Sequence, residues 1–261
     1  MSNSPSQVID LAPGNPYTLV LHSPVLMAPG CVVRDLDLAE LGALVTRTAT
    51  RHTRHEPAPR FARTPAGLVV TGFPTVSIRT LIKEDARQWE RSTIPVIVSL
   101  QGDPDELTEM AGRLENVESI SGLLIAPEAQ AATATAAVRR VTQRPILVLL
   151  DPSDLQPTAQ QTVAAGADAL VVAAPTEAAA GADLLEGYLL GPAALPLTLR
   201  ALREARAVVE VPLVALGGVT TVEHARQALA AGATALMIDA ARWGDPQAPA
   251  VIAQGLGVRV R

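Results

Sequence analysis

A glycine pair and an aspartate late in the sequence have the spacing of a phosphate-binding turn. Gly217-Gly218 follow the apolar run 211–216, and backbone N–H groups at such glycines can approach an anion closely because no side chain intervenes. The next apolar run, 234–238, ends at Asp239. In barrels of eight parallel strands, the loops after strands seven and eight commonly hold a phosphate. The pattern therefore predicts half of a phosphate site, with a negative charge in the other half.

Further carboxylates follow apolar runs elsewhere in the chain, at Glu128, Asp151 and Asp154. Barrel enzymes place catalytic groups at the ends of strands, where paired carboxylates can transfer protons or bind a metal ion. We take Glu128 and Asp151, together with Arg47, as candidate catalytic residues. The alternative is that they are polar loop residues without chemistry, and the sequence leaves both interpretations open.

The segment 51–63, RHTRHEPAPRFAR, is basic and contains prolines, which predicts an irregular loop. His52 and His55 lie three apart beside Glu56, a spacing that can bring two metal ligands together, but nothing completes a metal site and we predict none. Cys31 has no histidine at a motif spacing and is predicted to be a core or loop residue rather than a nucleophile. The arginines of the loop either gather an anion or are solvated; they are Arg51, Arg54, Arg60 and Arg63.

These residues are carried by short Val/Ile/Leu-rich runs that alternate with helical patterns, which is typical of βαβ units and a parallel sheet. We predict barrel strands at 25–28, 43–46, 96–100, 122–126, 146–150, 169–173, 213–216 and 235–238. We predict helices at 75–90, 104–115, 129–142, 155–165, 192–207 and 222–230. The fold class is α/β: a single (βα)8 TIM barrel over residues 1–261, with a short N-terminal hairpin within 8–20 and a second loop at 175–191.

The composition suits one barrel, whose typical length is about 250 residues. The chain has 261 residues, of which 48% are hydrophobic and 2% aromatic, so the core is built from Ala, Val and Leu. A net charge of −5 argues against nucleic-acid binding, which normally needs a basic face. One cysteine excludes an internal disulfide and favours the cytoplasm. We expect no membrane span and no signal peptide, because no apolar run is long enough and the first residues lack a basic and apolar start.

Several short motifs follow one another in a fixed order. They are SPVLMAPG at 23–30, LGALVTRT at 41–48, PR at 59–60, TPAGL at 64–68, VIVSLQG at 96–102, GADAL at 166–170 and GPA at 191–193. In this order they resemble the class 1 dihydroorotate dehydrogenases, FMN-dependent barrels of pyrimidine biosynthesis. The resemblance runs from about residue 11 to residue 241. It implies FMN across the barrel mouth, with dihydroorotate stacked on its ring.

The resemblance also assigns positions to the FMN site. They are Ala28, Gly30, Thr46, Arg47, Gly217, Gly218 and Asp239. Arg47 stands where the family has a lysine that approaches the flavin, and Asp239-Ala240 replace the family's Gly-Thr. Two unit charges about 4 Å apart interact by roughly 4 kcal/mol at an effective dielectric near 20, so Asp239 opposes a flavin phosphate. That objection fails if Asp239 is protonated, turned away or paired with Arg242.

Most polar groups of the family's substrate site are replaced in this chain. IAPEAQ at 125–130 replaces N-x-S-C-P-N, which supplies two asparagines and a cysteine base. Val70 and Ala174 replace substrate asparagines, and Leu149 replaces a flavin-contacting lysine. From Val70, Ala126, Leu149 and Ala174 we predict a mouth that is smaller and more apolar than a flavin site.

Three hypotheses follow from these departures. The first is a dihydroorotate dehydrogenase-like barrel that has lost the flavin and orotate chemistry, without FMN, acting as a non-catalytic or repurposed protein. The second is an active FMN-dependent oxidoreductase with altered contacts. The third is a different barrel enzyme that acts on an anionic metabolite. We expect a homodimer or a heteromer with a related subunit, and no nucleic-acid or membrane partner. We also predict that Arg47 pairs with a carboxylate, either Glu128, Asp151 or Asp239.

Overall fold

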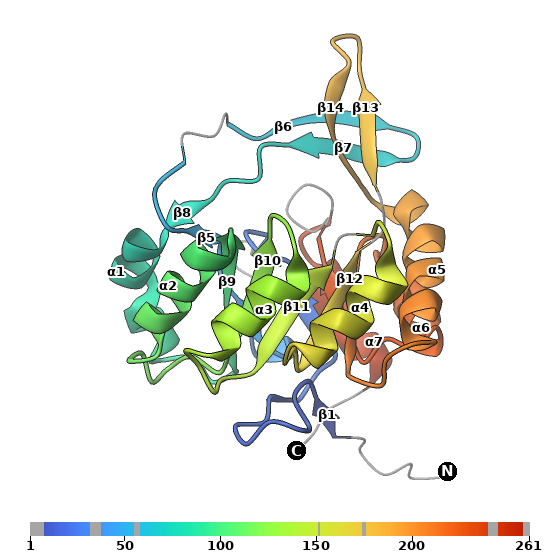
Figure 1. The fold of residues 1–261 in the computed structure, drawn as a ribbon. Coiled ribbons are helices and arrows are strands. Elements are labelled where there is room, and N and C mark those ends of the chain that lie inside the picture. The colour runs from blue at the N-terminus through green and yellow to red at the C-terminus, as the bar shows by residue number, and fades with distance from the viewer. Residues whose placement is uncertain are drawn as a thin grey trace.

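The computed structural model describes residues 8–31, 38–54, 58–150, 152–173, 176–239 and 245–257. Its centre is a barrel of parallel strands, as the sequence predicts (Figure 1). The barrel strands among the described residues are β3 (Val25–Met27), β4 (Leu44–Val45), β9 (Val96–Gly102), β10 (Gly122–Pro127), β11 (Ile146–Leu150), β12 (Ala169–Ala173), β15 (Leu213–Leu216) and β16 (Ala235–Ile238). Hydrogen bonds join them in the order β3-β16-β15-β12-β11-β10-β9-β4.

The circle closes between β3 and β4. Leu26 and Ala43 form an isolated parallel bridge, and the N–H of Gly42 donates to the carbonyl of Val25 at 2.8 Å. A Cβ at position 42 would overlap the carbonyl of Ser23, so the close approach of these two segments requires glycine there. The fold is therefore a closed α/β barrel of the (βα)8 type, as predicted.

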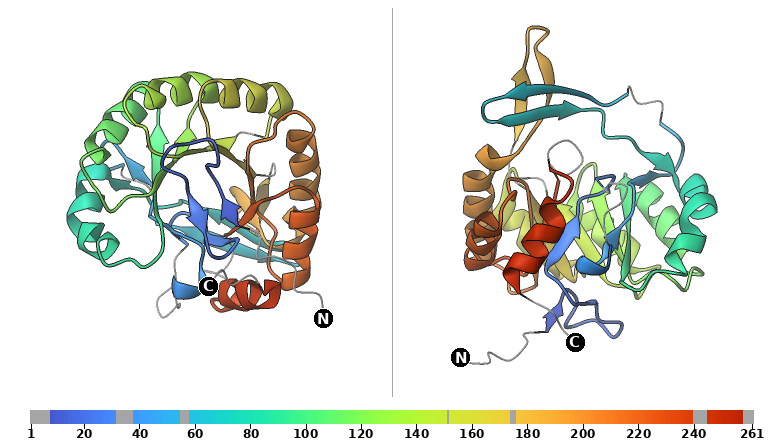
Figure 2. Two further views of the ribbon diagram at one scale, coloured as in Figure 1. Left: turned by 90° about the horizontal axis from the view of Figure 1, so that it is seen from below. Right: turned by 180° about the vertical axis from the view of Figure 1, so that it is seen from behind.

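Helices surround the barrel, as the view along its axis shows (Figure 2, left). In the described part of the chain they are α1 (Ile78–Trp89), α2 (Pro104–Leu114), α3 (Ala131–Arg139), α4 (Leu155–Ala164), α5 (Leu195–Arg206), α6 (Val222–Ala230) and α7 (Ala248–Leu256). Short 3-10 turns span Leu38–Glu40 and Pro192–Ala194. Local sequence explains the start of α2, where Asp103 and Glu106 form a capping box around Pro104. Helix α7 lies outside the predicted helices. No helix in the described ranges is long and apolar enough to span a bilayer.

An antiparallel hairpin lies at the end of the barrel where the strands begin (Figures 1 and 2). It consists of β1 (Ile9–Asp10) and β2 (Val20–Leu21), which confirms the predicted N-terminal hairpin. Leu11, Leu19 and Leu21 are fully or almost fully buried and join the barrel core. The hairpin thus covers this end of the barrel with apolar side chains.

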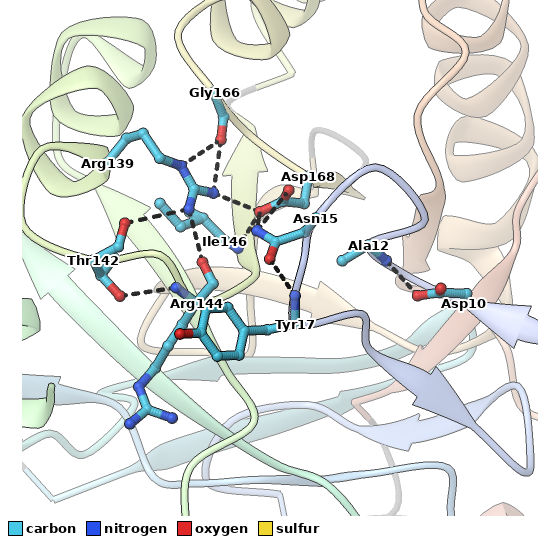
Figure 3. Close-up of polar contacts among 10 residues, drawn as sticks. All are labelled: Asp10, Ala12, Asn15, Tyr17, Arg139, Thr142, Arg144, Ile146, Gly166 and Asp168. Atoms are coloured by element: carbon cyan, nitrogen blue, oxygen red, sulfur yellow. Dashed lines mark hydrogen bonds and ion pairs between the residues drawn. The ribbon is translucent and has the colours of Figure 1, made fainter. Parts of the chain in front are cut away.

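Asp168, which directly precedes β12, ties the hairpin to the barrel (Figure 3). Its carboxylate accepts hydrogen bonds from Arg139 Nη2 at 2.5 Å, from the N–H of Ile146 at 2.7 Å, and from Asn15 Nδ2 at 3.1 and 3.2 Å. The side chains of Asp168 and Arg139 are only 14% and 23% exposed, so water weakens this ion pair little. The motif residue Asp168 therefore stabilises the fold at the end opposite the mouth.

The segment from α5 to β16 repeats this arrangement, but it lacks the carboxylate. Arg206 Nη2 donates to the carbonyl of Gly232 at 3.0 Å, as the arginine of the first unit does to Gly166. Both glycines have positive φ, +105° and +110°, and both pack against the arginine's Cγ. Thr234 stands where the first unit has Asp168. Burial lowers the pKa of Arg206, and the charge of Glu210 opposes this effect only in part.

A four-stranded antiparallel sheet, here called the cover sheet, lies beyond the end where the barrel strands finish (Figure 1). Its order is β13 (Glu177–Ala180), β14 (Leu185–Leu190), β7 (Gly67–Thr71) and β6 (Arg60–Thr64). Leu68, Val70 and Leu190 form a small apolar cluster of its own. The prediction of loops at 51–63 and 175–191 was therefore wrong for residues 60–63 and most of 177–190. The barrel strands β9 to β12 lie between β7 and β14 in the sequence, so no local pattern reveals their pairing.

Candidate functional site

The mouth of the barrel is the end where the parallel strands finish and where barrel enzymes act. Two short strands, β5 (Ala49–Thr50) and β8 (Val76–Ser77), extend the sheet there beside β9. Hydroxyl groups gather between the segment after β4 and strand β9. Thr46 Oγ1 accepts from the N–H of Ser99 at 3.1 Å and donates to the carbonyl of Arg47 at 2.9 Å, while Thr48 Oγ1 lies 3.1 Å from Ser99 Oγ. Thr46, a predicted cofactor position, is 4% exposed and bonded to the protein itself.

Arg47 has carboxylate partners, as predicted, but not the ones predicted. Its Nη2 donates to Glu84 at 2.9 Å and to both oxygens of Asp85 at 3.1 Å, and both acids belong to α1 in the outer ring of helices. Burial lowers the pKa of Arg47, but the hydrogen bonds and charges of these acids outweigh it and raise the pKa above its ordinary value. The guanidinium is therefore directed toward the helix ring.

The threonines on either side of Arg47 are directed toward β9 instead. Successive side chains of an extended segment point to opposite sides, and Thr46 and Thr48 both contact Ser99. Arg47 lies between them, and its guanidinium bonds to α1 instead of to β9. The acids Glu84 and Asp85 themselves were missed, since nothing local links them to β4.

On one side, the glycine turn after β15 packs against the protein's own backbone. Gly217 and Gly218 have φ of +107° and +84°, values that other residues rarely adopt. A Cβ at Gly218 would overlap the backbone of Leu195 at the start of α5, and Thr198 Oγ1 donates to the carbonyl of Gly217 at 2.9 Å. The glycines thus permit tight packing of the turn against α5.

Asp239 lies on the other side of the same turn. Its side chain is buried, at 7% exposure, and Oδ2 is 3.9 Å from the position that a Cβ on Gly217 would occupy. A phosphate that approached Gly217 would therefore meet a carboxylate. Asp239 and the glycine turn thus lie side by side at the position that the resemblance assigns to the FMN phosphate.

The remaining predicted FMN positions come from the loop after β3. Ala28 is buried, and its N–H donates to the carbonyl of Ile238 at 3.0 Å, which places this loop beside Asp239. Gly30 has φ of +70°, and a Cβ added to it would meet none of the described atoms within 4 Å. Cys31 is 2% exposed and packs in the main core, as predicted for a core residue.

Arg51 and Arg54, at the start of the predicted arginine loop, form ion pairs with acids beside the mouth. Arg54 Nη1 contacts Glu128 at 2.5 Å and Nη2 lies 3.7 Å from Glu106, while Arg51 Nε contacts Glu109 at 2.7 Å. These contacts fold the start of the loop onto α2 and the end of β10. Both arginines thus have carboxylate partners within the chain.

Other candidates lie apart from this mouth. Val70 is fully buried in the cover sheet and not at the end of a barrel strand, whereas Leu149 and Ala126 are partly buried at strand ends as predicted. Asp154 precedes α4 with a positive φ of +49° and makes no side-chain cap bond. Arg60 and Arg63 are exposed on β6, where Arg63 lies 5.9 Å from the ring of Phe61. Asp151, Ala174, Ala240, Arg242, His55 and Glu56 lie outside the described residues.

A family profile for dihydroorotate dehydrogenase matches residues 15–260. The chain belongs to the dihydroorotate dehydrogenase family. It is 34% identical to the protein called dihydroorotate dehydrogenase B (NAD(+)), catalytic subunit, of Desulforudis audaxviator, over 91% of this chain and 89% of that protein. Proteins with the same name are 32% identical in Pelobacter propionicus (91% and 90% covered) and 30% identical in Trichlorobacter lovleyi (92% and 90% covered). Membership of the family therefore accounts for the barrel fold. The residues that differ from the family at the mouth bear on the function of this chain.

Proposed function

We propose that this chain is a non-catalytic member of the dihydroorotate dehydrogenase family that acts as a subunit of a protein complex. One observation carries the proposal. Arg47, at the position of the family's flavin-approaching lysine, forms ion pairs with Glu84 and Asp85 of the helix ring. A guanidinium held there is not presented to a ligand in the mouth, and arginine, always protonated, cannot exchange a proton as lysine can.

The glycine turn and Glu128 support the same proposal. Gly217 and Gly218 face the backbone of α5 and the carboxylate of Asp239, which opposes an anionic cofactor. Glu128, a candidate acid or base, is paired with Arg54. The third hypothesis, an enzyme for an anionic metabolite, loses support, because the first arginines of the loop have partners within the protein and Arg47 does not converge with Glu128.

A direct test measures flavin in the purified protein. We expect no absorbance near 450 nm, no retention of added FMN, and no oxidation of dihydroorotate. The Desulforudis audaxviator relative, expressed and purified in the same way, is the matched control. A yellow protein that oxidises dihydroorotate would contradict the proposal.

An active FMN-dependent oxidoreductase is the second candidate, and two observations favour it. Identity of 34% over 91% of the chain to a named catalytic subunit is high enough for a shared activity, and the glycine pair of the phosphate turn is retained. The absorbance measurement separates the two candidates.

The names of the relatives include the word subunit, which supports a heteromer for this chain as well. The single cysteine supports a cytoplasmic protein.

A further inference from the structure

Helix α1 and the residues at its end carry a line of cations along the outer surface. Arg79, Lys83 and Arg87 lie on α1, Arg91 follows two residues after it, and all four are exposed. They are spaced four residues apart, and the three on the helix lie one above the other over roughly 12 Å, at 1.5 Å per residue. In a chain with a net charge of −5, this concentration of positive charge is local. We call these four residues the α1 stripe.

The α1 stripe makes no ion pair with any other described residue. Some exposed arginines of other helices do form ion pairs: Arg113 pairs with Glu109, Arg200 with Glu204 and Arg226 with Glu223, whereas Arg203 of α5 makes none with a described residue. Three acids lie within the span of the stripe. Arg47 binds two of them, Glu84 and Asp85, and the third, Glu90, follows the end of the helix.

Like charges four residues apart destabilise a helix, and α1 contains two such pairs in succession, with a third at its end. Arg47 shares the two acids that lie within the helix, so these acids are not reserved for the stripe. A negatively charged surface that bound the stripe would reduce the repulsion among its cations.

A cavity of about 420 Å³ adjoins the stripe at its C-terminal end. Its lining combines buried Leu44 and Ile94 with Arg87 and Arg91, and it also includes Glu84, which Arg47 binds, and the polar side chains of Gln88, Ser92 and Thr93. A lining with two arginines and two apolar side chains fits an acidic polypeptide that also presents an apolar side chain.

We infer that the outer face of α1 is a docking surface for a partner protein whose own surface is acidic. The net negative charge of the chain disfavours nucleic acid, whose binding depends on extended positive potential. A membrane surface fits poorly as well, because no large exposed hydrophobic residue of the described chain lies on α1. The inference deepens the proposed role as a subunit of a complex but does not depend on the loss of catalysis, since α1 lies in the outer ring of helices (Figure 2, left).

The first experiment measures binding of a short fluorescent poly-L-glutamate peptide by anisotropy at low salt. Replacing all four stripe residues by Gln should weaken binding at least about tenfold, because four ion pairs are lost, each modest by itself. A control variant has the same change of net charge on other exposed helix surfaces. It replaces Arg140, Arg200, Arg203 and Arg226 by Gln. Equal weakening in both variants would overturn the inference, as would equally tight binding of duplex DNA or anionic vesicles through the stripe.

The second experiment uses Lys83, which is the only lysine of the chain. A carbodiimide activates a glutamate carboxylate of the peptide, and the Lys83 amine displaces the activating group to form an amide, so that the water lost from acid and amine ends in the urea by-product. We expect mass spectrometry to find the peptide attached at Lys83, and high salt to suppress the reaction. Lys83→Arg keeps the charge and should bind normally without this cross-link. Absence of the cross-link in the parent, while the peptide is bound, would refute docking at α1.

Discussion

Removing the carboxylate of Asp168 should destabilise the whole protein from the end opposite the mouth. Asp168→Ala deletes the acceptor for Arg139, for the N–H of Ile146 and for Asn15. Breaking a buried ion pair by removing one partner typically costs about 3–5 kcal/mol. Arg139 keeps its bonds to the carbonyls of Gly166 and other residues, which reduces the loss. We therefore expect a loss of about 3 kcal/mol in the free energy of unfolding, in agreement with three hydrogen bonds of about 1 kcal/mol each.

The assay is urea unfolding followed by circular dichroism, with calorimetry for the melting temperature. For a protein of this size, about 3 kcal/mol corresponds to a decrease in Tm of roughly 6–12 °C. Asp168→Asn keeps one oxygen for the N–H of Ile146 but removes the charge, so it should lie between the parent and Asp168→Ala. Asp183→Ala, at an exposed position, should change stability by less than about 0.5 kcal/mol. If Asp168→Ala unfolds within that same margin of the parent, the reasoning about the partly buried cluster is refuted.

Three further substitutions test other parts of the molecule. Asp239→Gly should give the protein measurable, weak affinity for FMN or phosphate by calorimetry, because a repulsion of roughly 4 kcal/mol per charge at about 4 Å is removed; equal binding by parent and variant would contradict this. Glu84→Gln should lower the free energy of unfolding by less than about 1 kcal/mol, since the side chain of Arg47 is 39% exposed and water screens the pair; a loss of several kcal/mol in urea would show a stronger role. Thr234→Asp should give Arg206 the carboxylate that its unit lacks and raise stability by about 1 kcal/mol, measured as a higher Tm; an unchanged or lower Tm would show that the two units are not equivalent.

The barrel could be predicted because its strands are determined locally. Strands such as β11 and β12 are buried on both faces and are continuous apolar runs, and the residues between them have a helical pattern. The predicted helix at 222–230 coincides with α6, where Thr221 caps the first turn. These signals lie within a few residues of the elements they determine.

The mouth could be predicted only in part, because its contacts join distant segments. A carboxylate partner for Arg47 follows from its charge, but which acid it finds depends on the side of the chain to which it points and on what α1 presents there. The cover sheet depends on the pairing of Val70 with Tyr188, and neither strand sequence, GLVVT or LEGYLL, shows a clear alternation of apolar and polar residue types. Position in the family supplied the candidate residues, and only the three-dimensional arrangement shows what each contacts.

The cover sheet also has a consequence for the order of folding. Its central pair, β7 and β14, comes from segments on either side of four barrel strands, β9 to β12, so the chain between them must be organised before the two strands can meet. The apolar cluster that holds it, Leu68, Val70 and Leu190, is small and separate from the main core. Such a unit is expected to form last and to open first, as a cooperative unit of its own. Amide hydrogens of β7 and β14 should therefore exchange faster than those of β11 and β12, while the barrel beneath stays closed.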